Sequence, residues 1–143
     1  MSLATAVSHL SPVLVLALGL SLSACGGVPE SACLVGSEQL RTELFFGMDR
    51  ANDVPVTDAE FNAFVDTVVT PRFKDGLTVY DADGQYLMDN GNLVHENSKI
   101  LVLLHDGSAA RSADINAIRE EYKQRFHQES VLRIDSPSCV AFD

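Results

Sequence analysis

Six polar side chains could together bind an anion, because they lie where two helices are expected to end. They are Arg72, Asp75, Arg125, Gln128, Glu129 and Arg133. A guanidinium group binds a carboxylate or phosphate through two parallel hydrogen bonds, so such a group can form a ligand site. The same side chains can instead pair with one another and with the last carbonyls of the helices. We favour this structural interpretation and keep the anion site as the alternative.

Other reactive side chains do not follow a spacing that brings them to one point. His95 and His105 lack the separations typical of metal ligands. Asp81 and Asp83 resemble part of a calcium loop, but the glycine and glutamate positions of an EF-hand are absent, so we favour a solvated hairpin. The sequence also lacks a nucleophile elbow and a glycine-rich phosphate loop. We therefore predict no metal, no cofactor and no catalytic residue.

Cys25 stands at the end of an apolar amino-terminal segment without charged residues. Residues 12–24 are too few to span a bilayer but suit the core of a signal peptide. The sequence Leu-Ser-Ala-Cys that ends at Cys25 resembles the lipobox of bacterial lipoproteins, in which the thiol receives a diacylglycerol. We predict a signal peptide over 1–24 and lipidation of Cys25. The alternatives are a plain secretory signal and a buried helix.

The composition sets the class of the protein and its compartment. The chain has 143 residues, with 10 Lys and Arg against 20 Asp and Glu. This length fits one domain, and we divide the mature chain into a tether, 25–38, and a domain, 39–143. The net charge of −10, without a basic cluster, excludes nucleic acid as a partner. We expect a membrane-anchored protein of the bacterial cell envelope that faces the periplasm, on the outer membrane where the host has one.

Hydrophobic periodicity predicts the first strand and the first helix. Apolar and polar residues alternate over 40–46, as in a half-buried strand. Thr57 and Glu60 have the spacing of a capping box, and apolar residues follow at helical intervals. We therefore expect a helix over 58–70 that Pro71 ends.

A hairpin and a second helix complete the domain. Residues 77–80 and residues 93–104, which end in the apolar run 100–104, form two strands around a turn over 89–92, which contains Asn-Gly. Residues 81–84 are expected to form a bulge or a second turn. Ser112 can cap a helix that ends near 126, and the last strand covers 131–135. The order βαββαβ predicts an α+β, ferredoxin-like fold, a four-stranded antiparallel sheet with two helices on one face.

Cys33 and Cys139 flank the first and last strands of this arrangement. These two strands pair antiparallel, so the residues before the first lie near the residues after the last. Disulfides persist in an oxidising envelope. We therefore predict a bond between Cys33 and Cys139, with two free buried thiols as the alternative.

Five motifs resemble a single family and cover 40–141. They are Thr-Glu-Leu-Phe-Phe-Gly at 42–47, Val-Thr-Pro-Arg-Phe at 69–73, Asp-Gly-Leu-Thr-Val at 75–79, Tyr-Lys-Gln-Arg-Phe at 122–126 and Gln-Glu-Ser-Val-Leu-Arg at 128–133. Their order and spacing resemble domain-of-unknown-function family 3574, a group of small bacterial predicted lipoproteins without an established activity. The family pattern has glycine where this chain has His127. The resemblance implies a shared fold and names no substrate.

The sheet face turned away from the helices is the second functional candidate. If Leu44 and Phe46 point toward the helices, then Arg41, Glu43 and Phe45 point the other way. A bare patch of such mixed character binds a partner. Alternatively, the tether or the long hairpin folds over it.

These observations support two hypotheses of different kinds. The first is a non-enzymatic, lipid-anchored envelope protein that binds a second copy or another envelope protein through the open sheet face. The second is a small periplasmic enzyme or anionic-ligand-binding protein, with its site near Arg72, Arg125 and Glu129. We favour the first.

Overall fold

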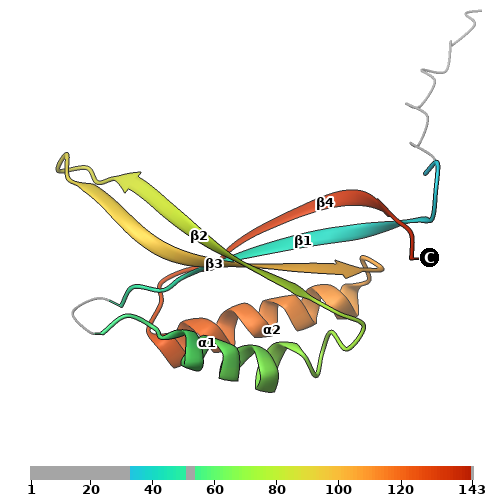
Figure 1. Cartoon of the computed structure of the whole chain (residues 1–143), viewed down its shortest axis with the longest axis horizontal. Coiled ribbons are helices and arrows are strands. Elements are labelled where there is room, and N and C mark those ends of the chain that lie inside the picture. Colours follow the sequence, from blue (N-terminus) through green and yellow to red (C-terminus); the bar gives the residue numbers. More distant parts are fainter. Residues whose placement is uncertain (1–32, 51–53, 143) are drawn as a thin grey trace, which may run out of the picture. The chain divides into compact units, whose positions relative to one another are not determined.

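A computed structural model describes residues 33–50 and 54–142 of the chain. Its elements are β1 (Ser37–Gly47), α1 (Asp58–Phe64), the π-helical turn η1 (Val65–Val69), β2 (Thr78–Leu87), β3 (Leu93–His105), α2 (Ala109–Phe126) and β4 (Leu132–Val140). The strands form one antiparallel sheet in the order β2-β3-β1-β4, and both helices lie on the same face (Figure 1). The predicted α+β, ferredoxin-like fold is confirmed. No helix of the described residues is long and apolar enough to cross a membrane. The predicted signal peptide and Cys25 lie outside the described residues.

The first helix begins and ends as its residues dictate. The Thr57 hydroxyl accepts the Glu60 N–H at 3.2 Å, and the Glu60 carboxylate accepts the Thr57 N–H at 2.8 Å, which completes the capping box. The last turn is wider than predicted, because the Thr70 N–H donates to the Val65 carbonyl five residues back, at 2.9 Å. Pro71 then follows and has no N–H with which to extend the helix.

An aromatic cluster forms the centre of the core between the sheet and the helices. The Phe46 ring from β1 meets Phe61 and Phe64 from α1 and Tyr122 from α2 edge-to-face, with ring centroids 4.5–5.9 Å apart. All four side chains have no exposed surface. The Tyr122 hydroxyl donates to the Gly47 carbonyl at 2.9 Å, which satisfies its polar end. These contacts fix both helices against β1.

The hairpin is more regular than predicted. Pairing between β2 and β3 runs from Thr78 opposite Val102 to Leu87 opposite Leu93 without an extra residue on either strand. Residues 81–84 therefore form neither a bulge nor a second turn. The predicted turn over 89–92 is present, and the Met88 N–H donates to the Asn92 carbonyl at 2.9 Å.

Two other boundaries differ from their predictions. Ser108, rather than Ser112, is the cap of α2, because its hydroxyl accepts the Arg111 N–H and an Asp106 carboxylate holds the Ser108 N–H at 2.9 Å. Strand β4 continues past 135 to Val140. It can include Pro137 because β4 is an edge strand, where a missing N–H costs no ladder bond on the solvent side.

The two ends of the described chain are joined. A disulfide links Cys33 to Cys139, with their Cα atoms 5.4 Å apart. Gly36 has a φ of +71°, and a Cβ there would lie 1.9 Å from the Val140 carbonyl oxygen, so only glycine fits this turn. Strand β1 begins at Ser37, within the segment 25–38 that was assigned to the tether.

Candidate functional site

The six residues of the predicted anion site are dispersed, and most have partners of their own. The Arg72 guanidinium donates to the Val68 carbonyl at 2.5 Å. Arg125 pairs with Glu121 at 2.8 Å, and its guanidinium lies over the Phe64 ring, 5.6 Å from the centroid. These contacts lie within one helix or between neighbouring helices, so both arginines reinforce the helical layer.

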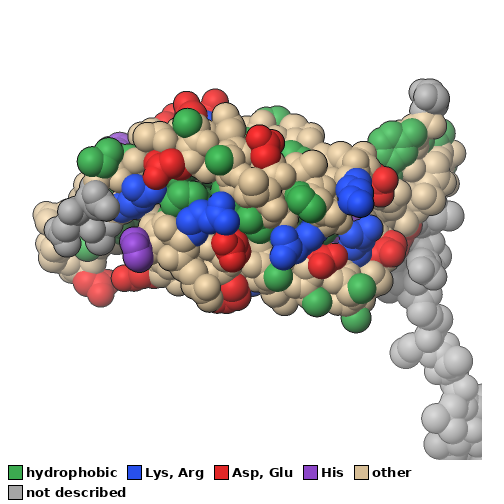
Figure 2. Space-filling view, turned by 90° about the horizontal axis from the view of Figure 1, so that it is seen from below, with side chains coloured by type: hydrophobic (Ala, Val, Ile, Leu, Met, Phe, Trp, Pro, Cys, Tyr) green, Lys and Arg blue, Asp and Glu red, His purple; other side chains and the backbone are tan. Residues whose placement is uncertain are grey.

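The other four residues lie apart from one another. The Gln128 amide donates to the Asp49 carbonyl at 2.6 Å, Glu129 is exposed, and Asp75 lines a cavity at the end of the sheet. Arg133 belongs to a polar network between β4 and α2. Figure 2 shows the helix-bearing side, where lysine and arginine side chains are spaced among acidic ones. The six residues therefore do not meet at one point, and of the contacts that the structural interpretation expected, the structure shows the bond from Arg72 to a helix carbonyl.

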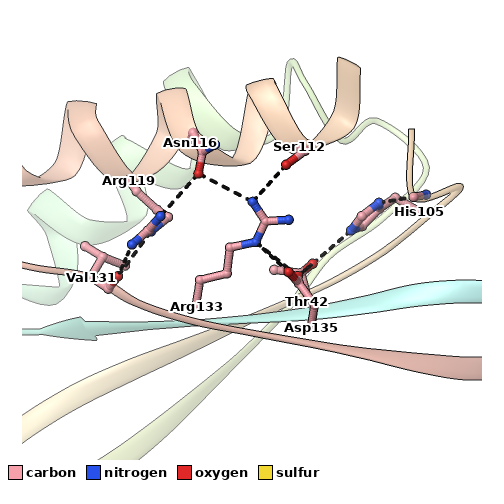
Figure 3. A network of polar contacts seen from close by, with 9 residues as sticks. Thr42, His105, Ser112, Asn116, Arg119, Val131, Arg133 and Asp135 are labelled. Atoms are coloured by element: carbon pink, nitrogen blue, oxygen red, sulfur yellow. Dashed lines mark hydrogen bonds and ion pairs between the residues drawn. The ribbon is translucent and has the colours of Figure 1, made fainter. Parts of the chain in front are cut away.

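The network around Arg133 has a defined direction of hydrogen bonding (Figure 3). The Gly107 N–H donates to Nδ1 of His105 at 3.1 Å, so the neutral imidazole carries its hydrogen on Nε2. Nε2 then donates to the Thr42 hydroxyl at 2.8 Å, and that hydroxyl donates to the Asp135 carboxylate at 2.5 Å. The Arg133 Nε donates to the same carboxylate at 3.0 Å.

Burial and hydrogen bonding set the charges in this network. Burial lowers the pKa of His105 below its ordinary 6.5, which favours the neutral ring. Burial acts to raise the pKa of Asp135, but hydrogen bonds from Thr42 and Arg133 outweigh it and hold that pKa below its usual value. The result is a neutral donor, a hydroxyl and an ionised acceptor in series.

The network contains a hydroxyl, an imidazole and a carboxylate, but it is not arranged for nucleophilic catalysis. The Thr42 hydroxyl donates to Asp135 rather than to His105, and Thr42 has no exposed surface. The Arg133 guanidinium continues to Ser112 at 3.1 Å and so reaches α2. The network joins three strands to α2, and its role is structural. The sequence did not reveal this set, since Thr42 and Asp135 become neighbours only through the β1–β4 register.

A cavity of about 710 Å³ lies at the end of the sheet near the disulfide. Its lining combines apolar side chains, such as Phe73 and Leu104, with charged ones. The charged lining residues are Glu38, Asp75, Asp106 and Arg111. The Arg111 guanidinium already donates to the Arg72 carbonyl at 2.6 Å and lies over the Phe73 ring. Three carboxylates against one guanidinium give the lining a net negative charge, so this cavity does not suit the anionic ligand of the second hypothesis.

The sheet face opposite the helices is uncovered by any described element (Figure 1). We call it the open face, and its side chains are Arg41, Glu43, Phe45, Tyr80, Ile100, Val102, Leu104, Leu132 and Ile134, which the strand register places on one side. Tyr80, Leu132 and Ile134 are 52%, 55% and 44% exposed. Neither the described tether residues nor the hairpin fold over this face.

A single ion pair lies among these apolar side chains. An Arg41 Nη lies 2.8 Å from a Glu43 carboxylate oxygen, and the two side chains are 41% and 27% exposed. The Nε of Arg41 is buried without a hydrogen-bond partner. The open face thus combines apolar surface with one cation and one anion side by side.

Comparisons with known proteins give a fold and a family. A phage SAM lyase, solved in complex with S-methyl-5'-thioadenosine and also in the apo state, is 21% identical, with TM-scores of 0.52 and 0.55. The two structures cover 77% and 72% of this chain, and this chain covers 87% and 83% of theirs. CutA from Synechococcus elongatus PCC7942 is 12% identical, with a TM-score of 0.47, over 73% of this chain and 83% of its own.

The comparison with curated proteins found no match. At these identities the similarity to solved structures describes the fold alone. A family model described as a protein of unknown function, DUF3574, matches residues 41–142. Because this match covers nearly all of the described domain, the chain belongs to the DUF3574 family.

Proposed function

We propose that the protein is a non-enzymatic, lipid-anchored protein of the bacterial cell envelope that binds a protein partner through the open face. The observation that carries the proposal is an uncovered, largely apolar sheet face on a domain that already has a complete core. Apolar side chains such as Leu132 and Ile134 gain free energy when a partner removes them from water. Contiguous exposed apolar surface is typical of interaction sites.

The chemistry of the open face suits a protein better than a small molecule. Ligand sites are concave. Val102 and Leu104 at one edge of this face line the cavity described above, but Leu132 and Ile134 do not. Arg41 and Glu43 give it a polar centre, which can exchange its internal ion pair for ion pairs with a partner. A partner of matching chemistry presents apolar side chains around an acidic group.

The non-enzymatic part of the proposal rests on the polar network. Its imidazole has both nitrogens occupied and its hydroxyl is inaccessible, so neither is available to a substrate. The phage SAM lyases share the fold, but one fold carries many unrelated activities. The similarity therefore does not transfer their reaction to this chain.

The anchor follows from Cys25, eight residues before the disulfide-bonded Cys33. Several acyl chains hold a protein at a membrane durably. Eight extended residues span at most about 29 Å, so an anchor at Cys25 keeps the domain close to the bilayer. Mass spectrometry of the native amino terminus tests this step: a diacylated Cys25 is expected, and an unmodified amino terminus at another residue contradicts it.

Thiol labelling tests the open face in the full chain. Ile134→Cys places a probe on the face, and Ala117→Cys places a matched probe on the exposed side of α2. N-ethylmaleimide labelling is followed in native membranes and again after dilution into detergent. If a partner occupies the face about 90% of the time, labelling of Ile134→Cys is about tenfold slower in membranes, and that of Ala117→Cys is unchanged. Equal rates for Ile134→Cys in both conditions would contradict the proposal.

A further inference from the structure

The hairpin of β2 and β3 extends well beyond the rest of the sheet. Strand β1 stops pairing with β3 at Gly47 opposite Ser98, whereas β2 and β3 continue to Leu87 opposite Leu93. Residues 84–96, which we call the arm, therefore pair only with each other. Figure 1 shows the arm as a two-stranded ribbon that projects from one end of the sheet.

The arm exposes large apolar side chains on a support that has no core of its own. Tyr86, Leu87, Met88 and Leu93 are 52%, 68%, 44% and 53% exposed. A two-stranded ribbon is marginally stable in water by itself, and it usually requires a third strand or a packed layer. The arm thus has both the apolar surface and the structural need for a contact outside its own domain.

The arm of a copy does not cover the open face of the same copy. Its register is continuous from Thr78 to Leu87, and no bulge at 81–84 bends it back over the sheet. The arm projects away while the face remains bare. One molecule therefore presents an apolar arm and an apolar face that require a second molecule to meet.

The charges of the two surfaces are also compatible. The segment 75–98 contains no Lys or Arg, and the arm carries Asp89 and Glu96. The cation of the open face is Arg41, whose side chain is 41% exposed and pairs with Glu43. An acidic arm can approach this guanidinium without bringing a like charge to it.

We infer that the arm of one copy packs on the open face of a second copy, so that Leu87 and Leu93, which the register places on one side of the arm, cover Leu132 and Ile134. Each copy has one arm and one face, so the contact closes either as a reciprocal pair or as a ring. Tethering to one membrane raises the local concentration of copies and favours this contact. The inference rests on the proposed function and names the partner of the open face.

Cross-linking between two full-length copies in native membranes tests the inference. One tagged copy carries Leu87→Cys in the arm, and a second copy, with a different tag, carries Ile134→Cys on the face. A short bismaleimide is expected to join them. Substituting Leu93→Ser in the arm-bearing copy removes an apolar contact beside the probe and should reduce the adduct, whereas Tyr86→Ser on the other side of the arm should change it little. The matched control pairs Leu87→Cys with Ala117→Cys on α2, and it should give only the background seen with the wild-type cysteines.

Each result has a separate meaning. An arm–face adduct no stronger than the arm–α2 control overturns the inference. So does a strong adduct between two Ile134→Cys copies without an arm–face adduct, since that indicates direct face-to-face packing. If Ile134→Cys is protected from labelling in membranes but no adduct between copies forms, the proposed function stands and its partner is a different protein. If Ile134→Cys is not protected, the proposed function fails as well.

Discussion

Both faces of the sheet carry apolar side chains, but the helices bury those of one face and leave those of the other exposed. Leu44 and Phe46 have no exposed surface, because α1 and α2 cover them, whereas Leu132 and Ile134 on the other face are about half exposed. Neighbouring strands of one sheet thus contribute apolar side chains both to the covered core and to the uncovered face. The difference shows that the helical face accounts for the stability of the domain, and that the apolar residues of the open face are available for contacts outside it.

Neighbouring phenylalanines on β1 provide the sharpest test of this difference. Phe46→Ala should lower the free energy of unfolding by about 3–5 kcal/mol, because it leaves a cavity in the aromatic cluster. Phe45→Ala, on the half-buried open side, should cost less than about 1.5 kcal/mol and should weaken partner binding instead. Urea unfolding of both variants provides the comparison. Equal losses would mean that the open face is part of the core.

The disulfide stabilises the end of the sheet that both faces share. Replacing Cys33 and Cys139 together by serine should lower the free energy of unfolding by about 2–4 kcal/mol, since a bond between residues 106 apart restricts the unfolded chain. Urea unfolding measures this loss. The protection of Ile134→Cys in membranes should persist, because the disulfide does not belong to the open face. Loss of that protection in the folded protein would show that the two features are coupled.

The hydrogen bonds from His105 to Thr42 and from Thr42 to Asp135 lie on the helix-covered face of the sheet. Thr42→Val preserves shape but removes the hydroxyl between His105 and Asp135, so a buried imidazole and a partly exposed carboxylate each lose a partner. The expected cost is about 1–3 kcal/mol in the free energy of unfolding. Thr78→Val, at an exposed position on β2, is the matched control and should change little. A neutral Thr42→Val variant would show that the network is dispensable.

Acid should lower the free energy of unfolding of the domain because His105 is buried on the helix-covered face. Because burial lowers the pKa of His105 in the folded state below the ordinary 6.5, the unfolded chain binds more protons just below pH 6.5. The neutral ring therefore stabilises the folded state fully above pH 6.5. This stabilisation decreases as the pH falls toward the lowered pKa. Unfolding measured between pH 7.5 and 5 should show a smaller slope in His105→Gln than in the wild type. An identical slope would assign the pH dependence to other groups.

The smallest expected effect is a gain in stability at the end of α2. His127 has a φ of 55°, a left-handed conformation that glycine adopts without steric cost. His127→Gly should raise the free energy of unfolding by about 0.5–1 kcal/mol, as measured by thermal unfolding. His127→Ala keeps the steric cost and should not stabilise. A stabilising alanine would refute this explanation.

The sequence predicted the elements that depend on local signals. The capping box at Thr57 and the Asn-Gly turn at 90–91 are correct, because hydrogen bonds within a few residues determine them. The cap of α2 was misplaced by one turn, since Ser108 and Ser112 are both plausible caps by type. The choice depends on Asp106, which holds the turn before the helix.

The functional residues were less predictable because they depend on register. The arginine group was predicted from its expected position at the ends of two helices, and its arginines prove to have separate partners in the folded domain. The Thr42–Asp135 contact can be found only when the register between β1 and β4 is known. The arm can be found only when it is known that β2 and β3 continue beyond the end of β1. Periodicity shows which side of a strand a residue occupies, but it does not give the offset between strands.

The bond between Cys33 and Cys139 has a mechanical consequence. A force applied to the segment before Cys33 reaches β1 through the backbone and β4 through the disulfide at the same time. The two adjacent strands are pulled as one unit, so β1 cannot be peeled from β4 one hydrogen bond after another. The domain can therefore bear a load at its amino-terminal end while its sheet keeps its shape.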